Sequence, residues 1–278
     1  MFKQATRKQS KLRMTIDGPA GAGKSYTALR FAHQLANGGK VAAIDTERGS
    51  LSKYAGDAPD GVPFEFDVLE LAQFSPEKYT EAIVAAGKAG YAVLVIDSLS
   101  HAWEGTGGAL EIKERQGGNQ YTAWRAVTPI HNRMVDAILQ SPCHVIATMR
   151  SRMEFVQETD ANGRVQVKKL GLAPIQRPGM EYEFDLVCDM DYAHILTVSK
   201  SRCSAVADLK MEKPGAEFMR PVMEWLSTGA AARPVLAVKS LDQLIAEYGV
   251  ENVMAATNGE MPTSNGDLQK LEARLQAA

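Results

Sequence analysis

The sequence predicts an α/β fold with a mostly parallel central sheet, flanking helices, an antiparallel edge and a small helical C-terminal appendage. Three observations support this prediction. Apolar runs of strand length alternate with segments of helical periodicity through most of the chain. A glycine-rich loop at residues 18–25 lies between the first strand-like run and the first helical segment. Two apolar runs, 184–190 and 193–198, are separated by a two-residue turn, which is typical of an antiparallel pair.

The length of 278 residues allows one large α/β domain and a small appendage. We expect a basic leader over residues 1–10, the core over 11–228, a linker over 229–239 and a small helical region over 240–278. The leader contains lysine and arginine but no acid, so it is either an arm that touches nucleic acid or a solvated, partly disordered segment. The last region shows no pattern that indicates chemistry.

Composition excludes several classes of protein. The formal net charge is −2, so any contact with nucleic acid must come from local basic patches. Cys143, Cys188 and Cys203 have no C-x-x-C spacing, and an odd number of cysteines without a metal pattern favours a reducing compartment. No apolar run has the length of a membrane span, and the N-terminus lacks the apolar stretch of a signal peptide. We therefore expect a cytoplasmic protein.

The loop at residues 18–25 reads GPAGAGKS and fits the P-loop pattern G-x-x-x-x-G-K-[ST]. Glycines let backbone N–H groups curl around a phosphate, and the N-terminus of the following helix adds partial positive charge. Lys24 would reach the β- and γ-phosphates of ATP, and the hydroxyl of Ser25 would ligate Mg²⁺. The residues expected to bind the nucleotide are Gly18, Pro19, Ala20, Gly21, Ala22, Gly23, Lys24, Ser25 and Tyr26.

Two acids follow apolar strands at the edge where open parallel sheets bind ligands. Glu47 comes just after the strand predicted over residues 40–45, so we predict that it polarises the attacking water. The alternative for Glu47 is a helix-capping or surface acid. A second apolar run ends at Asp97 in the Walker B pattern, and we predict that Asp97 and Ser25 hold Mg²⁺. Lys24, Glu47 and Asp97 are therefore catalytic candidates.

Two longer segments follow these strands. Residues 99–120 are rich in glycine and are expected to form a long loop, after which a helix runs to about residue 140 with Pro129 as its kink or its true start. Residues 150–170 are polar and contain a turn, so we expect a flexible hairpin that either contacts DNA or is simply solvated. Its candidate DNA-binding residues are Arg150, Arg152, Arg164, Lys168 and Lys169.

Two cations, Lys200 and Arg202, follow the second strand of the antiparallel pair. Residues two apart on an extended chain point the same way. Both side chains would then complete the ATP site of a neighbouring subunit, as an arginine finger does, and are further catalytic candidates. The alternative is surface charge far from any phosphate.

The strand that enters the P-loop, the segment 44–48 (IDTER) and the segment 94–98 (LVIDS) together resemble the core of RecA-type recombinases. The resemblance spans roughly residues 11–227. It is greatest to phage-encoded AAA-family ATPases with a RecA-like core, some of which anneal single-stranded DNA. The run 178–186 (PGMEYEFDL) is also similar to that group.

The resemblance implies a RecA-like P-loop fold and a role for each candidate residue. Glu47 would activate water, and Asp97 would be the Walker B acid. Lys200 and Arg202 would reach the ATP site of the next protomer. The loop after the strand that ends near Thr148 would contact single-stranded DNA.

We therefore expect an ATP- and Mg²⁺-dependent ATPase that is stimulated by single-stranded DNA and promotes DNA annealing or strand exchange in phage recombination. It would form a ring or filament with ATP between subunits in the cytoplasm of the host, and a single-strand-binding or other replication protein is a further expected partner. One alternative is a nucleotide-switched ATPase that acts on a protein partner, such as a helicase loader. Another is a small-molecule kinase, which the polar strand end at residues 45–47 and the long loop after Asp97 disfavour.

Overall fold

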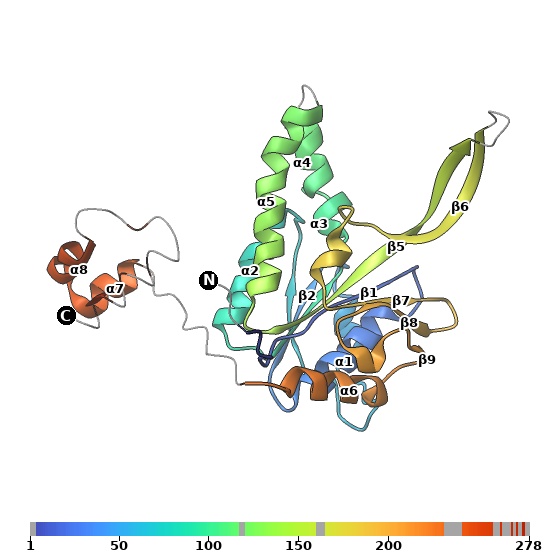
Figure 1. Ribbon diagram of the computed structural model, residues 1–278, viewed down its shortest axis with the longest axis horizontal. Coiled ribbons are helices and arrows are strands. Elements are labelled where there is room, and N and C mark those ends of the chain that lie inside the picture. The colour runs from blue at the N-terminus through green and yellow to red at the C-terminus, as the bar shows by residue number, and fades with distance from the viewer. Residues whose placement is uncertain are drawn as a thin grey trace. The chain divides into compact units, whose positions relative to one another are not determined.

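In the computed structural model, the described residues are 4–116, 120–159, 165–230 and 241–257, together with the single positions 262, 268, 271, 274 and 275. Over 154–159 and 165–171 the backbone alone is described. The chain divides into two compact units, Met1–Ala230 and Ala231–Ala278. Figure 1 shows the helices and strands of both units.

A sheet of nine strands, counted over the described residues, forms the middle of the first unit. Its order is β3-β2-β4-β5-β1-β7-β8-β9, and β6 pairs with the outer part of β5. The neighbours from β3 to β7 are parallel, whereas β7–β8, β8–β9 and β5–β6 are antiparallel. The strands are β1 (Arg13–Gly18), β2 (Val41–Asp45), β3 (Asp67–Glu70), β4 (Val93–Asp97), β5 (His144–Thr159), β6 (Val165–Pro174), β7 (Leu186–Met190), β8 (Ile195–Ser201) and β9 (Lys210–Glu212). The predicted α/β fold with a mostly parallel sheet and an antiparallel edge is confirmed.

Helices cover both faces of this sheet (Figure 1). Along β4, Val93 and Val95 face the core shared with α1 and α6, while Leu94 and Ile96 face the core shared with α2 and α5. A parallel strand covered on both faces needs an apolar residue at every position, so it reads as a continuous apolar run. The helices of the first unit are α1 (Lys24–Ala36), α2 (Pro76–Lys88), α3 (His101–Glu104), α4 (Ala109–Gln116), α5 (Gln120–Gln140) and α6 (Ala216–Ser227), with short 3₁₀ turns η1 (Leu51–Tyr54), η2 (Met180–Glu183) and η3 (Ser204–Val206).

The prediction of a long loop over residues 99–120 is wrong. Helices α3 and α4 occupy most of this segment, separated by a glycine-rich turn. Trp103, Ala109 and Val127 form a small apolar cluster between these helices and α5. Helix α4 is polar in sequence, and such a helix depends on tertiary packing that sequence periodicity does not show. Helix α5 continues through Pro129, so this proline does not mark its start.

The basic leader is not free where it is described. Lys8 forms a β-bridge with Ala230, and backbone hydrogen bonds join residues 7 and 9 to Ala230. The guanidinium of Arg7 donates a hydrogen bond to the carbonyl oxygen of Trp225 (2.6 Å) and lies 5.5 Å from the centre of its ring. Arg7 therefore satisfies a carbonyl in the last turn of α6, which has no partner inside the helix.

The second unit contains α7 (Leu241–Tyr248) and α8 (Val250–Thr257). Leu244, Val253, Leu271 and Leu275 form a small apolar core of its own. The expected linker falls outside the described residues from position 231 onward. Over the part of the chain that is described, no helix combines the length and apolar character needed to cross a membrane.

Arg13 ties β1 to the ends of α5 and β5. Burial lowers the pKa of Arg13 to about 10 and the charge of Asp185 opposes this shift, so the guanidinium remains charged at neutral pH. It donates hydrogen bonds to the carbonyl oxygens of Leu12 (2.9 Å), Cys143 (2.8 Å), Leu139 (3.0 Å) and Ser141 (2.5 Å).

We expect Arg13→Met to lower the free energy of unfolding by about 3 kcal/mol, because buried carbonyl oxygens lose their donor. Urea denaturation followed by circular dichroism measures this loss. Arg220→Met, at an exposed position of α6, is the matched control and should change the free energy by less than about 0.5 kcal/mol. Equal losses in the two variants would contradict the role given to Arg13.

Candidate nucleotide site

Residues 18–25 connect the carboxyl end of β1 to the first turn of α1. Gly23 caps α1 with φ +91°, a left-handed conformation that favours glycine. Gly18 permits a close approach, since a Cβ there would lie 2.4 Å from the carbonyl oxygen of Met190. The loop thus leads into a helix N-terminus whose first N–H groups have no partner within the helix and suit a phosphate.

The ammonium of Lys24 lies across this loop. It donates a hydrogen bond to the carbonyl oxygen of Pro19 (2.8 Å). Burial lowers the pKa of Lys24, and the charges of Asp97 and Glu47 oppose that shift. The two predicted acids therefore act electrostatically on the predicted phosphate-binding lysine.

Asp97, at the end of β4, is 2% exposed. Its Oδ1 accepts a hydrogen bond from the hydroxyl of Thr148 (2.5 Å) on the neighbouring strand β5. Its Oδ2 has no hydrogen-bond partner among the described residues. Burial raises the pKa of Asp97, and the neighbouring hydroxyls of Ser25 and Thr148 oppose that shift.

The unpartnered oxygen of Asp97 fits the predicted magnesium site. Mg²⁺ is usually bound through one or two carboxylates, waters and substrate phosphates. A buried carboxylate oxygen without a partner is unfavourable until a cation or a donor satisfies it. Asp97 and the hydroxyl of Ser25 are therefore suitable residues to hold this ion.

Glu47 and Arg150, which the sequence assigns to different tasks, form an ion pair. Oε1 of Glu47 accepts hydrogen bonds from Nη2 (2.8 Å) and Nε (3.1 Å) of Arg150. The N–H of Glu47 donates to the carboxylate of Asp45 (2.6 Å), and the N–H of Arg150 donates to the hydroxyl of Ser100 (2.9 Å). The guanidinium of Arg150 thus lies at the carboxyl ends of the parallel strands, where its partner is the predicted catalytic acid Glu47.

Sequence reasoning missed His101, which lies in the segment read as a loop. Its Nδ1 is 2.6 Å from the hydroxyl of Thr46, and its ring stacks on Phe74 at 4.9 Å. Burial lowers the pKa of His101, the charge of Arg150 lowers it further and the charge of Glu47 opposes this shift, so the site favours the neutral ring. Its position four residues after Asp97 was the available signal in the sequence.

Sequence reasoning also missed a buried acid pair beside the loop. Asp17, the residue before Gly18, pairs in register with Asp189 of β7. Oδ1 of Asp17 accepts a hydrogen bond from the hydroxyl of Thr15 (2.6 Å). Burial raises the pKa of Asp17 to about 8, Thr15 opposes this shift, and the charge of Asp189 adds to it. Burial also raises the pKa of Asp189.

Lys200 and Arg202 lie near the amino end of β7, whereas the P-loop of the same chain follows the carboxyl end of the neighbouring parallel strand β1. Lys200 pairs with Val187 near the amino end of β7. The ammonium of Lys200 donates to the carbonyl oxygens of Glu181 (3.0 Å), Tyr182 (2.7 Å) and Phe184 (2.8 Å). Arg202 donates to Oδ1 of Asp185 (2.8 Å), and its side chain is 57% exposed. Both cations therefore have partners within their own chain.

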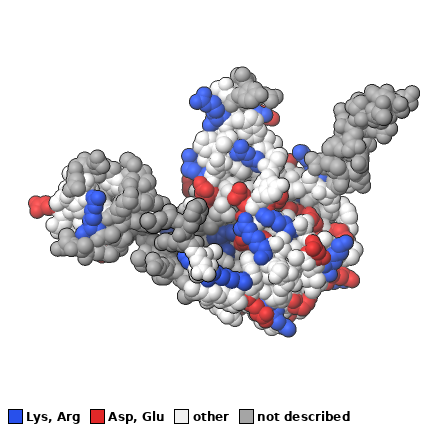
Figure 2. All heavy atoms as spheres, viewed as in Figure 1, with Lys and Arg blue, Asp and Glu red and all other residues white. Residues whose placement is uncertain are grey.

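The other predicted DNA-binding residues belong to the β5–β6 hairpin, which leaves the sheet (Figure 1). Arg152 is exposed on β5. Lys168 and Lys169 lie on β6, where the backbone alone is described, and Arg164 falls outside the described residues. Figure 2 shows basic and acidic side chains interspersed over the core on the face in view, in keeping with the balanced charge of the chain.

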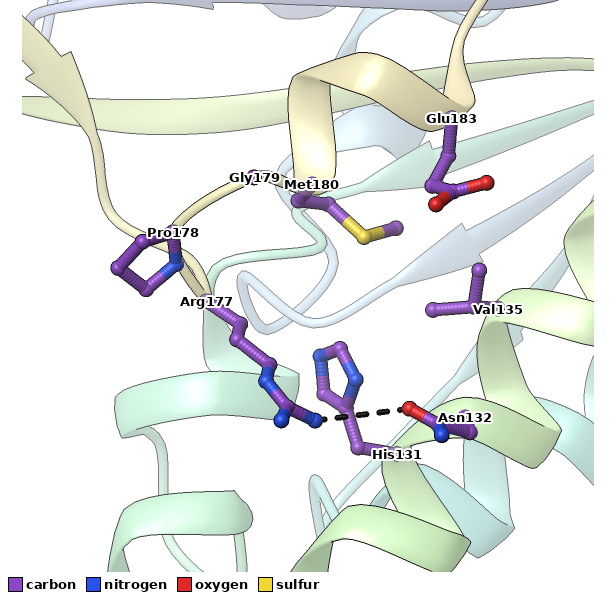
Figure 3. Close-up of a pocket in the computed structure, with 8 residues that line it drawn as sticks. All are labelled: His131, Asn132, Val135, Arg177, Pro178, Gly179, Met180 and Glu183. Carbon is purple, nitrogen blue, oxygen red and sulfur yellow. Dashed lines mark hydrogen bonds between the residues drawn. The ribbon is translucent and has the colours of Figure 1, made fainter.

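A cavity of about 150 Å³ lies between α5 and the segment before and within η2. Figure 3 shows Arg177 and Asn132 facing each other there, joined by a long hydrogen bond of 3.5 Å. The lining residues are His131, Asn132, Val135, Arg177, Pro178, Gly179, Met180 and Glu183. The predicted nucleotide-site residues do not line this cavity.

Comparison with known proteins identifies the family to which the chain belongs. The family model described as an AAA domain matches residues 10–212, more than half of the chain, and the match includes the P-loop, Glu47 and Asp97. The chain belongs to the AAA domain family. It is accordingly a P-loop ATPase, and its candidate nucleotide site lies inside the matched region.

Among solved structures, the crystal structure of the RadB recombinase is similar to this chain, with 19% sequence identity and a TM-score of 0.40. The similarity covers 72% of this chain and 87% of that one. No curated protein matches the sequence.

Asp17 makes stability depend on pH. The folded state keeps the proton of Asp17 up to about pH 8, whereas the unfolded chain releases it near its ordinary pKa of 3.8. The folded state therefore binds more protons between these values, and the free energy of unfolding falls as pH rises through them. We expect Asp17→Asn to remove this loss, so that the variant gains stability over the wild type from pH 5 to pH 8.

Urea denaturation at pH 5, 6.5 and 8 measures the effect. Asp208→Asn is the control, because Asp208 is exposed and its left-handed φ of +58° also suits asparagine. Parallel pH profiles for the wild type and Asp17→Asn would contradict the raised pKa.

Proposed function

We propose that this AAA-family ATPase is a RecA-like protein that binds single-stranded DNA and uses ATP to promote annealing or strand exchange in phage recombination. The observation that best supports this proposal is that β5 passes the predicted ATP-site residues and then continues into the hairpin. The strand contacts Asp97 through Thr148 and Glu47 through Arg150, and it then leaves the sheet as the hairpin with β6 (Figure 1). One continuous strand thus serves both the ATP site and the predicted DNA-binding hairpin, which supports coupling between the two.

The residues at the sheet edge have complementary roles in this proposal. The N–H groups of the P-loop and the ammonium of Lys24 bind the phosphates. Glu47 orients the attacking water, with its carboxylate placed by the guanidinium of Arg150. Mg²⁺, held by Ser25 and Asp97, would supply positive charge to the phosphate oxygens.

The hairpin supplies the DNA contact in this proposal. Arg152 is exposed on β5 two residues after Arg150, Lys168 and Lys169 lie on β6, and Arg164 comes just before β6 in the sequence. Cations on an extended arm suit the phosphates of a single strand without reading its sequence. Arg150 would act mainly on Glu47, because its guanidinium is already paired there.

Assembly of identical subunits with ATP between them is the last part of the proposal. A subunit would offer Arg202 to the ATP site of its neighbour. Arg202 is exposed and, among the described residues, has one carboxylate partner, and both features favour this role. Lys200 is less suited to it, because three carbonyl oxygens already accept from its ammonium.

The first test is ATP hydrolysis with and without single-stranded DNA at low and moderate salt. We expect DNA to stimulate turnover and the stimulation to fade with salt, because phosphate contacts weaken as counterions are added. Lys24→Ala should lower turnover by about 100-fold with or without DNA, since a charge that stabilises the transition state is lost. Arg152→Ala should reduce the DNA stimulation and leave the DNA-free rate unchanged.

The wild-type result separates the proposal from its rival. Turnover that ignores DNA, together with no DNA binding at either salt concentration, would reject the recombination function and favour an ATPase that switches a protein partner. Normal hydrolysis by Lys24→Ala would reject the assignment of the phosphate site itself.

Mixing experiments test whether ATP lies between subunits. We expect Arg202→Ala alone to hydrolyse ATP slowly, because the neighbouring site loses a cation. Mixing it with Lys24→Ala should restore part of the activity, since interfaces form that combine an intact P-loop with an intact Arg202. Failure to restore activity at any ratio, with both variants still assembling, would exclude the role across subunits.

A further inference from the structure

The turn between β7 and β8 packs against the P-loop. A Cβ on Gly18 would lie 2.4 Å from the carbonyl oxygen of Met190, and one on Gly23 would lie 3.2 Å from Nδ1 of His194. Residues 190–194 therefore pack against both ends of the glycine-rich segment. None of them belongs to the P-loop motif, and no sequence pattern marks them as nucleotide-binding residues.

His194 contacts the backbone of the loop directly. Its Nδ1 lies 3.0 Å from the carbonyl oxygen of Ala22. A carbonyl oxygen only accepts hydrogen bonds, so Nδ1 carries the proton and donates. The contact joins residues 172 positions apart in sequence.

This contact also determines the direction of the next N–H group, because the carbonyl of Ala22 and the N–H of Gly23 belong to one peptide unit. The peptide bond between Ala22 and Gly23 is trans, so its C=O and N–H lie in one plane and point in opposite directions. Holding the carbonyl of Ala22 against the β7–β8 turn therefore aims the N–H of Gly23 away from that turn. Over the described residues, this N–H donates to no protein acceptor, which leaves it available to a phosphate oxygen.

The position of His194 is itself fixed by the turn. The residue has φ +59°, a left-handed conformation that is uncommon outside glycine. Oδ1 of Asp191 accepts hydrogen bonds from the N–H groups of Ala193 (2.9 Å) and Ile195 (3.0 Å) on either side of it. The carbonyl oxygen of His194 accepts from the N–H of Lys213 (2.9 Å). A strained conformation that its surroundings hold in place is typical of functional sites.

We propose that His194 is a positioning residue for nucleotide binding: its Nδ1–H holds the carbonyl of Ala22 so that the N–H of Gly23 faces the nucleotide phosphates. The proposal rests on the P-loop as the nucleotide site but not on a role in DNA recombination. It predicts a loss of affinity for ADP and ATP alike, because the loop N–H groups serve phosphates that both nucleotides carry. It also predicts a raised KM with little change in kcat, because the contact acts before and during the chemical step equally.

The test compares His194→Asn with His194→Gly. Both residues tolerate the left-handed backbone, so neither variant introduces strain at this position. The side-chain amide of asparagine occupies the place of Nδ1 and supplies a donor, whereas glycine supplies none. Titration with fluorescent ADP should give nearly wild-type affinity for His194→Asn and about tenfold weaker binding for His194→Gly, the factor that corresponds to one hydrogen bond.

Thermal unfolding of both variants without nucleotide checks that they fold equally well. ADP affinities within twofold of the wild type for His194→Gly would overturn the proposal, and so would equal losses in the two variants. A wild-type protein that bound no nucleotide would instead reject the P-loop assignment. Turnover that ignores DNA would reject only the recombination function, so these failures are distinguishable.

Discussion

Parallel strand pairing is the constraint on which the nucleotide site depends. Every strand of a parallel sheet ends at the same edge, so segments far apart in the sequence meet there. Asp45 pairs in register with Asp97, and Gly18 pairs with Arg150. A shift of one residue in either pairing would turn these side chains to the opposite face of the sheet. The apolar cores on both faces therefore also determine the geometry of the site.

The same edge holds groups that are unfavourable for folding. Burial raises the pKa values of Asp17 and Asp97, so their ionised forms are less stable in the folded protein. Asp97 has an unpartnered oxygen beside Ser25, where a bound cation would stabilise the charged form of the carboxylate. Buried acids of this kind occur often at functional sites, where binding of a ligand offsets their unfavourable burial.

Two parts of the sheet support the P-loop site from different directions. Strand β5 reaches the acids through Thr148 and Arg150, and it continues into the hairpin. The antiparallel edge reaches the loop itself through His194. In the function proposed above, a movement of the hairpin would act on the groups assigned to hydrolysis, whereas the β7–β8 turn would act on the backbone assigned to nucleotide binding. Under these proposals, nucleotide binding and hydrolysis would depend on two different parts of one sheet.

The sequence by itself determined the α/β fold, the P-loop and the two acids at strand ends, because periodic burial and motif spacing are local properties of the chain. Only the tertiary structure decided that residues 99–120 contain helices, that Arg150 pairs with Glu47 and that His194 contacts Ala22. The two contacts join positions 103 and 172 residues apart. No local pattern specifies such contacts, since they follow from strand order and register, which packing of the whole sheet selects.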